Sequence, residues 1–157
     1  MYGEGTSGCS HFSPDFDPCV ESESLSILGR LYNWHAVDDE RGLCPVGWHV
    51  PGNEEWNNLA ELFGGASMAG IQLKSVTGWD ADGHGDNSSG FDGLPGGGRH
   101  YSSPDFAGAG VNGTWWSTSE ANGSITWYRL FSDSDSFSAG TYDYGHGTGF
   151  SIRCIKD

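Results

Sequence analysis

Apolar residues recur at helical spacing in two segments of the first half of the chain. The clearer segment is "PGNEEWNNLAELFGG", which places apolar side chains at every third or fourth position: Trp56, Leu59, Ala60 and Phe63. This spacing predicts an amphipathic helix of about three turns. Gly52 or Asn53 would cap its amino-terminal end, and two glycines would terminate it. The segment "LGRLYNWHAVDDE", which starts at Leu28, is compatible with a shorter helix that ends near residues 38–42.

Beyond residue 66 the pattern changes to short apolar or alternating runs that are separated by turn residues. Such runs are typical of strands. They occupy residues 71–75, 114–119, 125–132, 136–140 and 149–156. We therefore expect an α+β fold with a small, largely antiparallel sheet and long loops. Residues 1–24 are polar and rich in turn-forming residues, which predicts an irregular arm.

The segment "GFDGLPGGGRHYSSPDF", residues 90–106, contains three consecutive glycines and no regular hydrophobic period. The exposed backbone N–H groups of such a run can bind an anion. Here, however, no Lys-Ser or Lys-Thr pair follows the glycines, and no helix pattern opens after them. We interpret the run as a corner of the fold, where glycine allows positive φ and close backbone approach.

The composition restricts the possible partners. A chain of 157 residues is long enough for a single domain with its own core, and its 7 Trp, 6 Tyr and 8 Phe supply aromatic surface to bury. Its formal net charge of -14 would repel phosphate backbones and anionic lipids, so nucleic acids and membrane surfaces are poor partners. No run of 18 apolar residues is present, and we expect no membrane insertion.

The four cysteines include no C-x-x-C pair and no zinc-finger spacing, which predicts two disulfides. Of the three possible pairings we favour Cys9 with Cys19, which closes a local loop, and Cys44 with Cys154, which ties the middle of the chain to its end. Disulfides indicate an oxidising compartment or a virion surface. The first residues lack the basic and apolar regions of a signal peptide, so we expect that a leader was trimmed or that the chain leaves its cell by another route, such as lysis by a phage.

Seven motifs carry a resemblance to a known family. In order along the chain they are "GRLYNWHAV", "CPVGWHVPGNEEWNNL", "LKSVTGW", "GFDGLPGGGR", "WWSTSE", "WYRLF" and "GFSIRCIKD". From about Gly29 to Asp157 the chain resembles the major paralogous domain first noticed in Fibrobacter succinogenes. This family is similar to the C-type-lectin-like fold shared with the formylglycine-generating sulfatase-modifying factors and with the variable proteins of diversity-generating retroelements.

The resemblance implies two short helices packed against a twisted antiparallel sheet, a pairing of Cys44 with Cys154, and secreted or surface-displayed hosts among Bacteroidetes-like bacteria and their phages. It divides the chain into an irregular arm, 1–28, and a C-type-lectin-like domain, 29–157. Family members usually begin with an additional strand that is missing here, so the sheet lacks this strand or a neighbouring chain supplies it. In this fold Phe91 and Leu94 would anchor the glycine corner in the core.

The segment "WDADGHGDNSSGFD" alternates oxygen donors with glycines, as a Ca²⁺ loop requires. The candidate metal ligands are Asp80, Asp82, Asp86 and Asn87. The segment begins like an EF-hand loop, but Phe91 occupies the twelfth position, where an EF-hand has glutamate, and this excludes a true EF-hand. An irregular Ca²⁺ loop and a solvated acidic turn both remain open.

The segment from Thr114 to Gly147 combines aromatic rings with small hydrogen-bonding side chains, a mixture that suits sugars and protein epitopes. We expect its ligand-binding residues to be Trp116, Ser117, Asn122, Trp127, Asp133, Asp135, Tyr142, Asp143, Tyr144 and His146. For the tryptophans, burial in the core is the competing interpretation. In retroelement-diversified relatives this segment carries the varied residues.

The sequence gives little support for catalysis. No G-x-S-x-G or H-E-x-x-H segment occurs, and His49 in "GWHVP" is most simply a structural histidine. We therefore expect a non-catalytic recognition domain, secreted or displayed on a cell or phage surface, that binds a glycan or a surface protein. The alternative is a structural subunit of a surface filament or phage fibre, in which a neighbouring chain supplies the missing strand.

Overall fold

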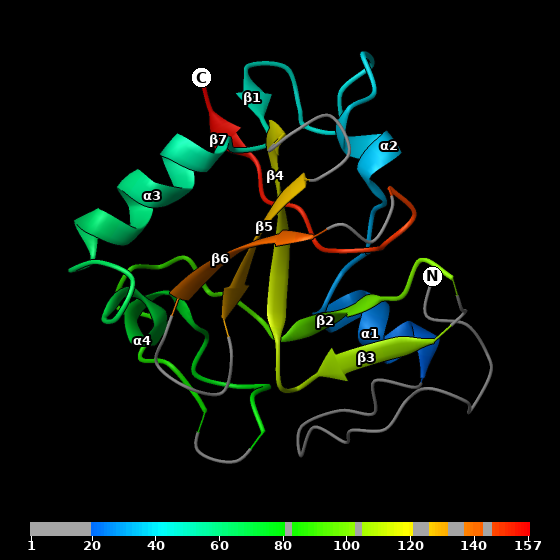
Figure 1. Ribbon diagram of the computed structural model, residues 1–157. Coiled ribbons are helices and arrows are strands. Elements are labelled where there is room, and N and C mark those ends of the chain that lie inside the picture. Colours follow the sequence, from blue (N-terminus) through cyan, green and yellow to red (C-terminus); the bar gives the residue numbers. More distant parts are fainter. Residues whose placement is uncertain (1–19, 81–82, 103–104, 121–125, 132–136, 143–145) are drawn as a thin grey trace.

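The structure is a computed structural model that describes residues 20–80, 83–102, 105–120, 126–131, 137–142 and 146–157; for 126–131 and 137–142 it describes the backbone. The elements are α1 (Glu21–Ile27), α2 (Trp34–Val37), β1 (Trp48–His49), α3 (Asn53–Leu62), α4 (Ala69–Leu73), β2 (Gly96–Arg99), β3 (Phe106–Ala109), β4 (Gly113–Glu120), β5 (Thr126–Phe131), β6 (Phe137–Tyr142) and β7 (Ile155–Lys156). The predicted α+β class is confirmed (Figure 1).

The strands form two small sheets. The larger sheet has the order β3-β2-β4-β5-β6, and β1 pairs with β7 in a separate two-stranded sheet (Figure 1). Between these strands the pairing is antiparallel, except that β2 runs parallel to β4. The prediction of a largely antiparallel sheet is therefore confirmed, and the strands predicted at 114–119, 125–132 and 136–140 correspond to β4, β5 and β6.

Two consecutive tryptophans place β4 between two hydrophobic clusters. Because side chains alternate between the faces of a strand, Trp115 and Trp116 point to opposite sides of the sheet. Trp115 packs with residues from α3, α4 and the loop that follows: Trp56, Ala60, Ala69, Leu73 and Trp79. Trp116 packs with residues from α2 and two other segments: Trp34, Val37, Val50 and Phe150. Strand β4 is thus the wall between two cores, with α3 and α4 on one side and α2 on the other (Figure 1).

The helix predicted around Trp56 is confirmed as α3. It begins at Asn53, and Glu55 Oε2 accepts a hydrogen bond of 2.8 Å from the N–H of Gly52, which satisfies a donor at the helix start. The shorter predicted helix is reduced to α2, because Tyr32 pairs with Phe150 as a β-bridge and the helix starts only after Asn33.

Three predictions of local structure are corrected. Residues 71–75 are not a strand: Ala69 and Leu73, both fully buried, lie four positions apart on one face of α4, and a short apolar run fits either period. Residues 149–156 form single bridges at 149, 150 and 151 before β7, rather than one continuous strand. Residues 21–27, in the segment expected to be irregular, form α1. Within the described residues, no helix is long and apolar enough to cross a membrane.

Candidate functional site

The structure buries two residues that were expected to bind a ligand. Trp116 is 1% exposed, and its indole N–H donates a hydrogen bond of 2.6 Å to the carbonyl oxygen of Tyr32. Ser117 is fully buried in the same strand. Since almost none of either side chain is exposed, neither can reach a ligand at the surface. The prediction that Trp116 and Ser117 contact a ligand is therefore wrong, and the competing interpretation of Trp116 as a core residue is correct.

The structure describes only some of the other residues that were expected to bind a ligand. Trp127 lies in β5 and Tyr142 at the end of β6, where the backbone is described. Five more lie outside the described residues: Asn122, Asp133, Asp135, Asp143 and Tyr144. For these seven residues, ligand contact stays a prediction.

His146 anchors the chain to α2. Its ring lies 5.3 Å from the ring of His35 and 6.4 Å from that of Trp34, and its carbonyl oxygen accepts a hydrogen bond of 3.0 Å from the N–H of Trp34. The Nε2 atom of His146 is buried and has no hydrogen-bond partner among the described residues. His146 therefore has a structural contact on one side, and its role in binding stays a prediction.

A cavity of about 250 Å³ lies where the expected binding segment begins and ends. Thr114 and Thr148, which flank that segment, meet there beside β2 and β3. We call this space the β2–β3 cavity; its lining residues are Gly97, Gly98, Arg99, His100, Ala107, Gly108, Asn112, Thr114, Thr148 and Phe150. The glycine run is thus a strand and one wall of a cavity, and not only a corner.

Glycine is required for the close packing of this wall. Gly97 has φ +61, and a side chain there would overlap the backbone of Ala107 on β3. At Gly98 a Cβ atom would lie 2.8 Å from the Phe150 ring. Arg99 exchanges two backbone hydrogen bonds of 2.9 Å with Gly149, which hold the chain around Phe150 against β2. The predicted role of the glycines, positive φ and close backbone approach, is confirmed.

The polar groups of the β2–β3 cavity are distinctive. Arg99 is partly buried, and its guanidinium makes no hydrogen bond or ion pair with the described residues. The side-chain amide of Asn112 likewise has no partner in that part of the chain. No Asp or Glu is found among the described residues that line the cavity, and the ring of Phe150 supplies an apolar surface. The described lining therefore combines one arginine, neutral hydrogen-bonding groups and an aromatic ring.

Two other cavities are less suited to recognition. One of about 380 Å³ lies between α1 and residues 151–153, and the chain that leads into α1 lies outside the described residues before Val20. The other, of about 190 Å³, lies between α3 and residues 153–155 and is lined mainly by apolar side chains. We therefore take the β2–β3 cavity as the candidate site.

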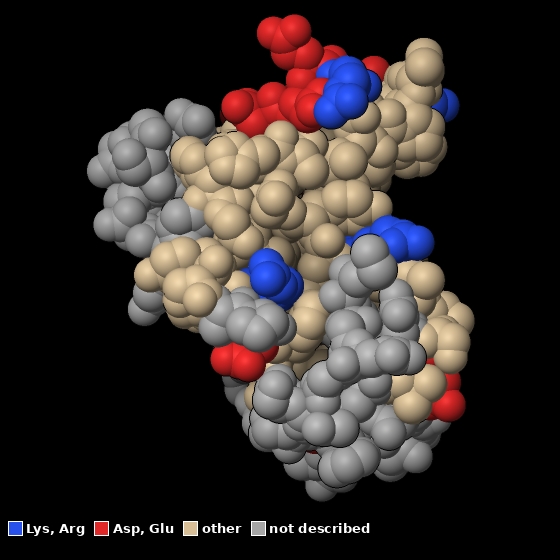
Figure 2. Space-filling view, turned by 90° about the vertical axis from the view of Figure 1, so that its right-hand side faces the viewer, with Lys and Arg blue, Asp and Glu red and all other residues tan. Residues whose placement is uncertain are grey.

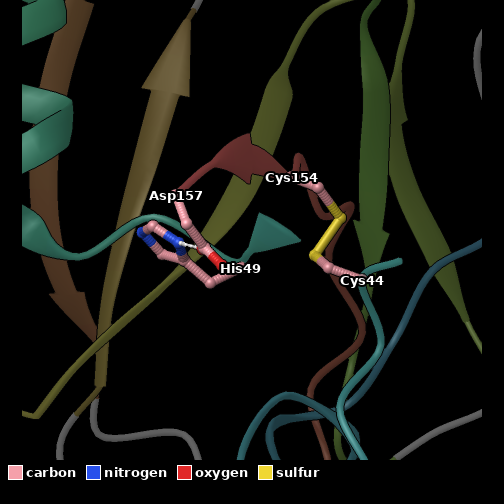
Figure 3. Close-up of a disulfide and its surroundings, with 4 residues drawn as sticks. All are labelled: Cys44, His49, Cys154 and Asp157. Carbon is pink, nitrogen blue, oxygen red and sulfur yellow. Dashed lines mark hydrogen bonds and ion pairs between the residues drawn. A yellow bond between two sulfur atoms is a disulfide. The ribbon is translucent and has the colours of Figure 1, made fainter. Parts of the chain in front are cut away.

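The predicted disulfide between Cys44 and Cys154 is present, with the Cα atoms 5.8 Å apart (Figure 3). It joins the loop before β1 to the segment before β7. Cys9 and Cys19 lie outside the described residues, so their pairing stays a prediction. A disulfide is typical of proteins from an oxidising compartment.

His49 lies beside the disulfide and forms two ion pairs (Figure 3). Its Nδ1 is 2.6 Å from Asp157 Oδ1, and its Nε2 is 2.8 Å from Glu55 Oε1. The hydrogen bond to Asp157, followed by that to Glu55, raises the pKa of His49 above its ordinary value. The N–H of Gly52, followed by His49, lowers the pKa of Glu55. The prediction of His49 as a structural histidine is confirmed, because it connects β1 to α3 and to the end of the chain.

The described part of the proposed calcium loop is stabilised by its own hydrogen bonds. Asp86 Oδ1 accepts a bond of 2.9 Å from the N–H of Ser88, which lowers the pKa of Asp86, and Asn87 Oδ1 accepts one of 2.8 Å from the N–H of Asp92. Among the described residues no three His, Cys, Asp or Glu side chains are grouped as a metal site, and Asp82 lies outside them. Calcium binding near Asp80 stays a prediction, which thermal melts with millimolar Ca²⁺ and with EDTA would test.

The sequence model of the Fibrobacter succinogenes major domain matches residues 12–156. The chain belongs to this family. The match begins inside the segment expected to be an irregular arm, 1–28, and includes α1. No curated protein matches the chain, and no solved structure matches it. For this member of the Fibrobacter succinogenes major domain family, the C-type-lectin-like fold and the relationship to retroelement-diversified proteins stay predictions.

Sequence reasoning missed Arg99 and Asn112 as residues of the candidate site in this Fibrobacter succinogenes major domain. They lie 13 positions apart, and the residues that complete the cavity, Thr148 and Phe150, come much later in the chain. No local pattern predicts this proximity. The one available signal was an arginine directly after a glycine run in a chain that has only 7 Lys and Arg residues.

Proposed function

We propose that the protein is a non-catalytic recognition domain, secreted or displayed on a cell or phage surface, that binds a glycan or a protein ligand. The observation that carries the proposal is the β2–β3 cavity, in which Arg99 and Asn112 offer unpaired polar groups beside the ring of Phe150. Polar side chains that line a cavity and have no partner among the described residues are available to hydrogen-bond a ligand. A mainly apolar pocket with a few placed polar groups is the usual form of a ligand site.

The scaffold supports this function by holding the cavity walls rigid. Strand β2 is hydrogen-bonded to β3, to Gly149 and to Asn112, so three segments fix its position. The disulfide between Cys44 and Cys154 supports a location outside the reducing cytosol. A preorganised wall favours binding because little conformational entropy is lost when the ligand enters.

A cavity-filling variant tests the proposal. Ala107 is exposed on β3 and lines the cavity, so A107W would occupy it. The wild type and A107W would be applied to arrays of glycans and bacterial surface proteins, with A66W as the control, since Ala66 is exposed in a turn far from the cavity lining. We expect a ligand that the wild type and A66W bind and A107W does not. Binding that A107W leaves unchanged, or turnover of chromogenic glycosides, would contradict the proposal.

A second proposal is assembly with a neighbouring chain. Strand β6 has six residues, lies at the edge of the five-stranded sheet and pairs with β5 on one side only among the described strands. An edge strand of this length can accept a strand from another molecule. Size-exclusion chromatography tests this: a concentration-dependent oligomer would support assembly, and a monomer at all concentrations would contradict it.

A further inference from the structure

We propose that the β2–β3 cavity takes a carboxylate-bearing sugar, with the carboxylate on Arg99. This inference rests on the recognition function proposed above and names the ligand class for the same site. It depends on three properties of the cavity, namely the guanidinium of Arg99, which has no partner among the described residues, the size of the cavity and its neutral polar groups.

Arg99 differs from Arg41 and Arg153, which both have a partner among the described residues. Arg41 forms an ion pair of 2.6 Å with Asp39, and Arg153 donates a hydrogen bond of 2.6 Å to the carbonyl oxygen of Phe91. The guanidinium of Arg99 has no such partner in the part of the chain that the structure describes, although Arg99 is partly buried. A partly desolvated cation is stabilised by an anion, and the guanidinium fork matches the two oxygens of a carboxylate.

The charge of the molecule favours a small anion over a polyanion. The formal net charge is -14, which repels a chain of phosphates at long range. On the face shown in Figure 2, Lys and Arg side chains appear at separate places rather than as one continuous patch. A single carboxylate needs one guanidinium and is repelled far less by the distant acids, since physiological salt screens charges beyond about 8 Å.

The rest of the cavity matches a sugar ring. A volume of about 250 Å³ is below the range of drug-sized ligand sites and accommodates a group of one ring. Asn112 and Thr114 place an amide and a hydroxyl along the wall, and each of these groups can both donate to and accept from a sugar hydroxyl. The ring of Phe150 offers an apolar surface for the C–H groups of the sugar. The carboxyl end of a peptide would use Arg99 equally well but would leave the hydroxyl-matching groups unused.

The test compares matched small probes. Binding of glucuronate, glucose and N-acetylalanine to the whole chain would be measured by ligand-detected NMR and calorimetry at constant ionic strength. We expect glucuronate to bind about tenfold or more tightly than glucose, as a charge-assisted hydrogen bond predicts. R99Q should remove this preference and leave the thermal melt unchanged, because the guanidinium has no hydrogen-bond or ion-pair partner among the described residues. R30Q removes the same charge from an exposed arginine outside the cavity lining and should retain the preference.

Each outcome decides a different point. Equal affinity for glucuronate and glucose, or a preference that R99Q retains, would overturn the acidic-sugar proposal while leaving recognition intact. Loss of the preference in R30Q would show that the carboxylate binds outside the cavity, and would also overturn the acidic-sugar proposal. Tight binding of N-acetylalanine without binding of glucuronate would assign the carboxylate to a peptide instead. Failure of the recognition function itself would appear separately, as array binding that A107W leaves unchanged.

Discussion

At the scale of single residues, His49 has the clearest pH-dependent role. A neutral imidazole has one N–H and can donate to only one of its two carboxylate partners, whereas the protonated ring donates to both Asp157 and Glu55. This explains why the pKa of His49 is raised. Folding therefore favours the protonated ring, and the ion pairs stabilise the native state only while His49 carries its proton.

We expect this stabilisation to be lost as the pH rises. Because the folded pKa lies above the unfolded value of about 6.5, the contribution is complete below about pH 6.5 and disappears as the pH rises through the folded pKa. Thermal melts between pH 5.5 and 9 should show the wild type above H49Q at the acidic end, with the difference shrinking toward pH 9. H84Q, at an exposed histidine, is the control and should follow the wild type. A difference that is independent of pH would contradict this role.

At the scale of the elements, the packing of β2 against β3 requires glycine at position 97. Gly97 combines φ +61 with a backbone approach from β3 that leaves no room for a side chain. We expect G97A to lower the free energy of unfolding by about 2 to 5 kcal/mol, through left-handed strain and steric overlap together. Chemical denaturation would measure it.

A second glycine separates these two effects. Gly90 also has a positive φ, +72, but no atom lies within 4 Å of its would-be Cβ. G90A should therefore cost only the strain, about 1 to 2 kcal/mol. If the two variants lose the same stability, close packing of β2 on β3 is not what selects glycine.

The helices and strands with a long hydrophobic pattern could be predicted from the sequence, and those with a short pattern could not. Trp56 and Ala60 repeat within a ten-residue helix, and α3 was correctly predicted. The apolar run at 71–75 is too short to distinguish the helical period from the strand period. Strand β1, with two residues, gives no hydrophobic pattern at all. For the site, close backbone approach at Gly98 could be predicted from composition, but its partner Phe150 could not, since tertiary pairing brings them together.

At the scale of the whole molecule, one disulfide restrains most of the chain. Cys44 and Cys154 are separated by 110 positions, so their link removes many conformations from the unfolded state. We expect the double variant C44S/C154S to lose about 2 to 5 kcal/mol in guanidinium unfolding, and the C9S/C19S variant to lose a similar further amount when reductant opens its remaining bond.

A second double variant provides the control. C9S/C19S removes the pair expected to close a short local loop, so it should lose less, because loop entropy grows with loop length. Equal losses would show that the long-range link has no special role in restraining the chain.

The scattered pairings of residues 149–156 have a consequence for biogenesis. This last segment supplies the partners of Tyr32, Arg99, Trp115 and β1, which lie in widely separated parts of the chain. A ribosome or an export channel releases the chain from its amino terminus onward. Until residues 149–156 emerge, the cluster around Trp116 lacks Phe150 and β1 lacks its partner β7, so we expect these parts of the fold to be completed only late in synthesis.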